Sequence, residues 1–188
     1  MARAIEGALF TLVLLSGLLA VSGRISFAVG IVLAVVTLAG QWADIIWPNG
    51  PIGPFYLIPA ILFLGLVVAR LLFFILQSDQ VNTETLCASV AGFLMIGLLW
   101  ALIYLFLARL SPGSFVLNEP GQVMDGFNAF YFSFVTLSTI GYGDITPVSR
   151  VARMLAVMEA ITGMFYLTVL VARLVSIHSA APKKPREE

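Results

Sequence analysis

Long apolar runs separated by short polar breaks constrain the fold of this chain most strongly. Runs at about residues 25–46, 55–76, 86–108 and 151–177 reach roughly 20 residues, enough to cross a bilayer core of about 30 Å as a helix. A further run at about 9–21 is shorter. Because the chain is 60% hydrophobic and 11% charged, we predict an all-α integral membrane protein with about five transmembrane helices.

A shorter apolar segment lies between the last two long runs. Residues 127–138 offer about 12 mostly apolar positions, too few to span a bilayer, and they follow a polar loop. We predict a re-entrant helix here, capped by Asp125 or Asn128. Irregular backbone at membrane depth is tolerated only where protein or a water-filled cavity surrounds it. The negative end of this helix dipole would favour a cation at its C-terminus.

The next segment suits the coordination of a dehydrated cation. It consists of Thr139, Ile140, Gly141, Tyr142, Gly143 and Asp144. Successive carbonyl oxygens face one axis only with backbone angles nearly forbidden to most residues, which Gly141 and Gly143 adopt without a Cβ clash. Thr139 adds a hydroxyl oxygen, whereas Ile140 and Tyr142 are expected to pack behind the row. One chain supplies one quarter of such a ring, so the interpretation requires four copies. The alternative is a Gly-Tyr-Gly turn beside a membrane helix.

From about residue 86 to 178, this order of helix, short helix, filter-like segment and helix resembles the pore domain of tetrameric potassium channels. It is most similar to bacterial ion channel proteins that carry several helices before one pore unit. The resemblance implies a homotetramer in a lipid bilayer. It also implies that K⁺ is bound by the carbonyls of residues 139–142 and the hydroxyl of Thr139, below an extracellular mouth at residues 143–144.

Three regions follow from this interpretation. Residues 1–85 hold about three spans, residues 86–178 form the pore domain, and residues 179–188 form a short cytoplasmic tail. A voltage sensor would need arginines at every third position along one helix. The helix before the outer pore helix carries only Arg70, which we expect to extend toward the membrane interface.

The resemblance also assigns residues that support the filter. Tyr131 and Phe132 occupy the positions of an aromatic cuff, and we expect Tyr131 to donate a hydrogen bond to Tyr142. Val135 stands where the family often places an acidic residue, so gating that needs a carboxylate finds none at this position. Thr136 belongs to the same supporting helix.

Glu159 is the one acid within the apolar residues 154–172. An ionisable group at membrane depth is costly unless it is paired or faces water. We favour a role in supporting the filter over direct contact with the ions. Alternatively, Glu159 has a structural role and forms a hydrogen bond with a hydroxyl or amide group, such as that of Thr162, Thr136 or Asn128.

Gly163 has two possible roles. It lies twenty residues after Gly143, where the resemblance places a gating hinge. Alternatively, with Ala156 and Ala160, it permits close packing against a neighbouring helix.

Charged and metal-ligating residues exclude several classes of function. The net charge is zero, so no basic surface for nucleic acid is present. The chain has a single cysteine, Cys87, and a single histidine, His178, which do not suffice for the usual metal centres or a Cys/His nucleophilic site. We therefore expect no cofactor, with K⁺ as the permeant ion.

The filter fixes an expected orientation. If its mouth faces outward, the last helix ends inside, in agreement with the basic tail. Counting back through the spans places the N-terminus outside. We therefore expect a multi-pass protein of the plasma membrane, the inner membrane of a bacterium, with a cytoplasmic C-terminus. Arg109, Arg150 and Arg153 would flank the pore mouth, anchoring helix ends or pairing with Asp144.

Taken as a sequence, the chain is best interpreted as a potassium-selective channel subunit, passive and not enzymatic. A weakly selective monovalent cation channel and a non-conducting regulatory or scaffold subunit are the alternatives. A transporter subunit fits less well, because such proteins place four non-identical loops in one long chain. No catalytic constellation favours a membrane enzyme.

Overall fold

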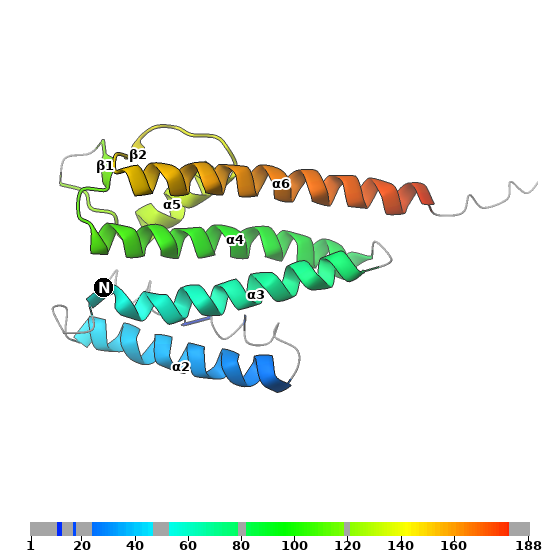
Figure 1. Cartoon of the computed structure of the whole chain (residues 1–188), viewed down its shortest axis with the longest axis horizontal. Coiled ribbons are helices and arrows are strands. Elements are labelled where there is room, and N and C mark those ends of the chain that lie inside the picture. The colour runs from blue at the N-terminus through cyan, green and yellow to red at the C-terminus, as the bar shows by residue number, and fades with distance from the viewer. Residues whose placement is uncertain are drawn as a thin grey trace, which may run out of the picture.

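The computed structural model describes residues 11–12, 17, 24–46, 53–78, 82–118 and 121–180. The elements in chain order are α2 (Arg24–Ile46), η1 (Gly53–Tyr56), α3 (Leu57–Gln77), α4 (Thr83–Leu110), β1 (Phe115–Leu117), α5 (Gly126–Leu137), β2 (Ile145–Pro147) and α6 (Arg150–Ala180). Helices α2, α3, α4 and α6 lie side by side in that order (Figure 1). The short helix α5 contacts both α4 and α6.

The helices have the length and composition of membrane spans. Gly53–Gln77, Thr83–Leu110 and Arg150–Arg173 are each long and apolar enough to cross a bilayer, and Ala28–Asp44 is a shorter apolar helix. The chain is therefore an all-α integral membrane protein, with three such spans among the described residues. The first predicted span, at about 9–21, lies almost entirely outside the described residues.

Helix α4 is the central element of the bundle, in contact with α3, α5 and α6. Asn82 caps its start by accepting a hydrogen bond of 2.9 Å from the backbone N–H of Thr85. The absence of a side chain at Gly97 brings α5 close, because an added Cβ there would lie 2.5 Å from the Phe134 ring. Small residues let helix backbones approach in this way inside membranes.

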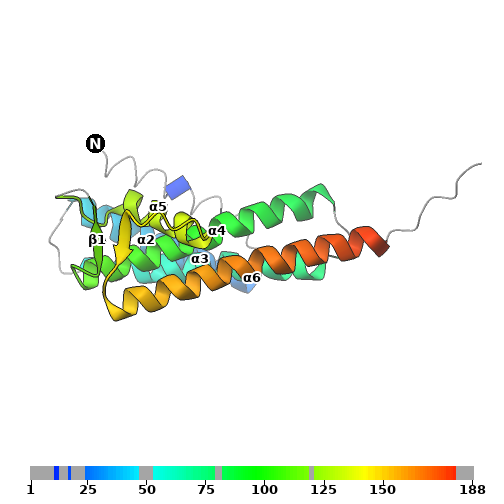
Figure 2. The ribbon, with the colours of Figure 1, turned by 90° about the horizontal axis from the view of Figure 1, so that it is seen from above.

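A small antiparallel sheet, which was not predicted from the sequence, brackets α5 and the loop that follows it. Strands β1 and β2 pair Phe115 with Pro147 and Leu117 with Ile145. They lie at one end of the bundle beside the start of α6 (Figure 2). The backbone N–H of Val148 also donates to the Ser114 carbonyl at 2.9 Å. The loop that follows α5 is therefore held at its far end by a backbone ladder.

Three aromatic side chains form the core between α4, β1 and α5. Phe132 lies 4.9 Å from Tyr104 and 5.5 Å from Phe115 between ring centroids, in edge-to-face arrangements. Phe132 is 6% exposed. Phe132 therefore packs into the core of its own chain behind α5. Its role in an aromatic cuff around the filter stays a prediction.

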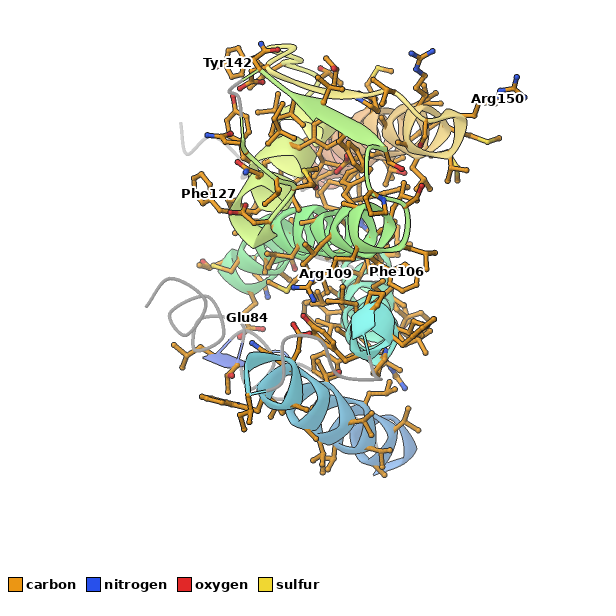
Figure 3. The ribbon with its side chains drawn as sticks, turned by 90° about the vertical axis from the view of Figure 1, so that its left-hand side faces the viewer. Glu84, Phe106, Arg109, Phe127, Tyr142 and Arg150 are labelled. Atoms are coloured by element: carbon orange, nitrogen blue, oxygen red, sulfur yellow. The ribbon has the colours of Figure 1, made fainter. Side chains whose placement is uncertain are left out.

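Arg109 connects the pore-side helices to the N-terminal ones. Its guanidinium donates to Asp44 of α2 at 3.0 Å and to the Tyr56 hydroxyl at 2.9 Å. Figure 3 shows it on the side of α4 that faces α2. Of the two predicted roles, Arg109 therefore has the first: it anchors the end of α4, through Asp44 and Tyr56 and not through Asp144. Arg153 does anchor a local turn, donating to the Pro147 carbonyl at 3.2 Å.

Candidate functional site

The filter-like segment has an unusual backbone. Thr139, Gly141 and Gly143 all have positive φ, at 59°, 59° and 78°. The two glycines adopt the angles for which the sequence analysis required glycine. Thr139 was not predicted to do so, and this conformation costs a residue with a side chain roughly 1–2 kcal/mol. Left-handed angles at every second residue fit neither helix nor strand, and suit a row of carbonyls along one axis.

The entry to this segment is fixed by the carbonyl end of α5. The backbone N–H of Ile140 donates to the Val135 carbonyl at 2.9 Å, and that of Thr139 donates to the Thr136 carbonyl at 2.9 Å. Val135 and Thr136 thus contact the segment through their main chain. The start of α5 is capped by Asp125, which accepts from the N–H of Asn128 at 2.8 Å. Of the two proposed caps, Asp125 is confirmed.

The exit is fixed by Asp144. Its carboxylate accepts a hydrogen bond of 2.6 Å from the Tyr131 hydroxyl and one of 3.0 Å from the N–H of Ile145. Its backbone carbonyl accepts from the N–H of Asn118 at 3.0 Å. The prediction that Tyr131 donates to Tyr142 is therefore wrong, and so is an arginine partner for Asp144 among the described residues. A tyrosine hydroxyl has one hydrogen to donate, and Tyr131 donates it to Asp144.

The bond between Tyr131 and Asp144 has a defined pH range. The hydrogen bond from Tyr131 lowers the pKa of Asp144, and the same bond raises the pKa of Tyr131 to about 12. Because the pKa of Asp144 is lower in the folded state, the stabilisation is complete above its unfolded value. It is lost as pH falls through the lowered folded value.

We therefore expect Tyr131→Phe to destabilise the exit of the loop at neutral pH. The unfolding temperature in detergent should be lower in the variant than in wild type at pH 7, and the difference should close as pH falls through the lowered pKa of Asp144. Equal unfolding temperatures at pH 7 would contradict the role assigned to the bond.

Glu159 is fully buried, at 0% exposure, between three helices. The Tyr104 hydroxyl of α4 donates to Oε2 at 2.5 Å, and the Ser133 hydroxyl of α5 lies 2.5 Å from Oε1. None of the anticipated partners contacts it. Thr162 donates to the Met158 carbonyl and Asn128 to the Val123 carbonyl. Glu159 thus links α6 to the helix that precedes the filter.

Gly163 lies directly against the end of α5. An added Cβ would overlap the carbonyl oxygen of Leu137 and lie 3.1 Å from its Cδ1 atom. Helix α6 continues without a break through this position. The close-packing role of Gly163 is therefore supported by a specific contact, which it makes with Leu137 at the end of α5. The hinge stays a prediction.

Gly163→Ala tests the two roles of this glycine. Close packing predicts a loss of about 1–3 kcal/mol of stability, since the obstructing group is backbone. Thermal unfolding in detergent measures this loss. Gly65→Ala in α3 is the matched control, because an added Cβ there meets nothing within 4 Å, and it should be neutral or stabilising. Unchanged stability with altered gating in Gly163→Ala would instead support the hinge.

Within one chain the filter-like segment is uncovered. Tyr142 is 69% exposed and Ile140 is 54% exposed, so these side chains do not pack behind the segment in a single chain. Tyr142 lies at the outer edge of the chain, on the side away from α2 (Figure 3). A Cβ added at Gly141 or Gly143 would meet nothing within 4 Å. These glycines are therefore required by conformation and not by crowding.

Sequence reasoning missed Tyr104, Ser133 and Gly97 as members of the site. A weak signal was present, because Ser133 and Tyr104 place hydroxyls among apolar neighbours in their helices. Their partner was not identifiable, since Tyr104 and Glu159 are 55 residues apart. No group of three or more His, Cys, Asp or Glu side chains suited to a metal ion occurs in the described part of the chain.

A short helix that leads into a strained loop, held between two membrane-spanning helices, defines a pore-loop membrane protein. A family model described as "Ion channel" matches residues 92–179. The chain is 30% identical over 125 residues to Protein LctB of Bacillus caldotenax, covering 60% of this chain and 92% of that protein. It belongs to the ion channel family, which is not a family of enzymes.

Several other relatives of the chain are named as potassium channels. The chain is 32% identical over 99 residues to Two-pore potassium channel 4 of Arabidopsis thaliana, covering 52% of this chain and 35% of that protein. It is 44% identical over 61 residues to Voltage-gated potassium channel Kch of Escherichia coli (strain K12), covering 28% and 14% respectively. The chain thus spans about a third or less of the length of these relatives.

Proposed function

We propose that four copies of this chain form a potassium-selective pore that conducts K⁺ passively. The observation that carries this proposal is the backbone of residues 139–143, with positive φ at every second residue. Anchors at both ends hold this backbone: the carbonyls of α5 at the entry and the Tyr131–Asp144 bond at the exit. Pre-formed, rigidly held carbonyls are what replaces the hydration shell of an ion.

The side chains that one chain leaves exposed support an assembly of several copies, and the number four comes from the resemblance to tetrameric channels. Besides Ile140 and Tyr142, the apolar face of α6 that turns away from α4 is uncovered. Its exposed residues include Val151, Met154, Val157, Met158, Ile161, Met164 and Phe165. Copies arranged around an axis at the filter would cover the filter side chains and part of this face, while lipid would cover the rest.

In the proposed mechanism, an ion enters from the aqueous cavity at the C-terminal end of α5. It exchanges water for the Thr139 hydroxyl and then for successive carbonyls up to Tyr142. Repulsion between ions on adjacent sites drives the outermost ion past Gly143 and Asp144. K⁺ is then the permeant ion, and no other cofactor takes part.

The direction of the proposed ion path also sets the expected orientation of the chain in the membrane. The filter mouth faces the outside of the plasma membrane, the inner membrane of a bacterium, and the C-terminus lies in the cytoplasm. Residues 86–178 form the pore domain, and helices α2 and α3 lie on the side of α4 away from the filter. The Arg109–Asp44 ion pair supports this arrangement by connecting α2 to α4.

A weakly selective cation pore is the second candidate. Val135 favours it, because this side chain offers no hydrogen bond with which to stiffen the filter from behind. Reconstituted protein in liposomes separates the candidates. If a K⁺ gradient drives a flux and a Na⁺ gradient does not, the result supports the K⁺-selective pore. Equal fluxes of the two ions would support the weakly selective pore. Crosslinking to a species of four chains tests the assembly, and absence of both fluxes would contradict a conducting pore.

A further inference from the structure

The hydrogen bonds around Glu159 define how many hydrogen atoms the cluster must contain. The Ser133 hydroxyl oxygen lies 2.7 Å from the Gly97 carbonyl oxygen and 2.5 Å from Oε1 of Glu159. Both distances are those of O–H···O hydrogen bonds. A serine hydroxyl has one hydrogen and can donate only once. One of these two contacts therefore needs a hydrogen from elsewhere.

The other members of the cluster leave one source for that hydrogen. The Gly97 carbonyl is an acceptor only, and the Tyr104 hydroxyl already donates its hydrogen to Oε2 of Glu159. Distances of 2.5 Å also occur in bonds to ionised carboxylates, so distance does not decide the charge. If Glu159 were ionised, Ser133 would donate its single hydrogen to the carboxylate. The oxygen atoms of Ser133 and Gly97 would then lie 2.7 Å apart with no hydrogen between them, which is a repulsive contact.

The surroundings of Glu159 give a second, independent argument. It is fully buried in a membrane-spanning segment. Tyr104 is the titratable side chain that contacts it, and no cation lies within ion-pair distance of it in the described part of the chain. A buried charge without a counter-ion is far more costly than a buried neutral acid with its hydrogen bonds satisfied.

We propose that Glu159 is a protonated, uncharged carboxylic acid that acts as a positioning residue for the pore helix. Its Oε1–H donates to Ser133, Ser133 donates to the Gly97 carbonyl, and Tyr104 donates to Oε2. Every hydrogen is used once and every oxygen has a partner. This one-way chain of neutral bonds holds α4, α5 and α6 together six residues before Thr139. The positioning role rests on the proposed function, whereas the protonation rests on the geometry.

Infrared spectroscopy of the full-length protein in lipid at neutral pH tests the protonation directly. We expect a C=O stretching band of a protonated carboxyl group that is present in wild type and lost in Glu159→Gln. Glu84→Gln is the matched control, because Glu84 is an exposed glutamate in the first turn of α4, and it should retain the band. Absence of the band in wild type, or its persistence in Glu159→Gln, would overturn the protonation.

Conduction through the same variants tests the positioning role. Glutamine supplies an N–H donor for Ser133 and a carbonyl for Tyr104, so Glu159→Gln should conduct K⁺ and unfold near the wild-type temperature. Glu159→Leu lacks both groups and should lose conduction and thermal stability together. Loss of conduction in Glu159→Gln, with thermal stability retained, would overturn the positioning role. Wild-type protein that shows the band but carries no K⁺ would contradict the proposed function while upholding the protonation.

Discussion

Gly141→Ala is expected to abolish K⁺ current while leaving the protein folded. Gly141 has φ of 59°, where an alanine costs roughly 1–2 kcal/mol. Four chains would each carry this strain, so about 4–8 kcal/mol opposes the conducting backbone of the tetramer if the costs add. The strain is relieved by turning the peptide, which takes a carbonyl away from the axis. Planar bilayer recordings measure the current, and crosslinking measures the assembly.

Gly121→Ala is the matched control for this variant. Gly121 has a comparable φ of 84°, and an added Cβ there also meets nothing within 4 Å. It therefore reproduces the backbone strain outside the filter, in the loop before α5. We expect this variant to conduct. An undiminished K⁺ current in Gly141→Ala, or an equal loss in Gly121→Ala, would defeat the assignment of residues 139–143 as the filter.

Phe132→Ala is expected to cause the largest loss of stability. The ring of Phe132 contacts both Tyr104 and Phe115, so its removal leaves a cavity between α4, β1 and α5. Buried Phe to Ala substitutions cost about 3–5 kcal/mol in soluble proteins. We expect about 3 kcal/mol here, because apolar transfer contributes little inside a membrane. Thermal unfolding in detergent measures the loss, and conduction should fall with it as α5 becomes displaced.

Phe73→Ala provides the comparison for Phe132→Ala. Phe73 lies on α3 and is 57% exposed, so its ring faces the surroundings of the chain and leaves no cavity when removed. We expect its unfolding temperature to stay near that of wild type. If the two variants were equally stable, the aromatic cluster would not hold the pore helix in place.

Local rules predicted the features that depend on a few neighbouring residues. Asp125 was recognised as a candidate cap from residue type and position, and the requirement for positive φ at Gly141 and Gly143 followed from sterics. A short helix was expected over residues 127–138, and the structure has one at Gly126–Leu137. Each of these features is determined by residues that lie within one or two helical turns of one another in the sequence.

Features that depend on tertiary contacts were missed or misassigned. The sheet of β1 and β2 joins segments about 30 residues apart, each only three residues long, which is too short for a recognisable alternation of apolar residues. Arg109 was expected to anchor a helix end or to pair with Asp144, but the residue that it pairs with was not identified. Its partner Asp44 is 65 residues away, so the ion pair was not accessible to local reasoning.

The reversal potential of purified protein in a planar bilayer, with K⁺ on one side and Na⁺ on the other, tests the central claim most directly. A filter of rigidly held carbonyls predicts a reversal far toward the K⁺ equilibrium potential. A reversal near zero would contradict K⁺ selectivity and point to a filter that is relaxed because Val135 gives it no hydrogen bond from behind.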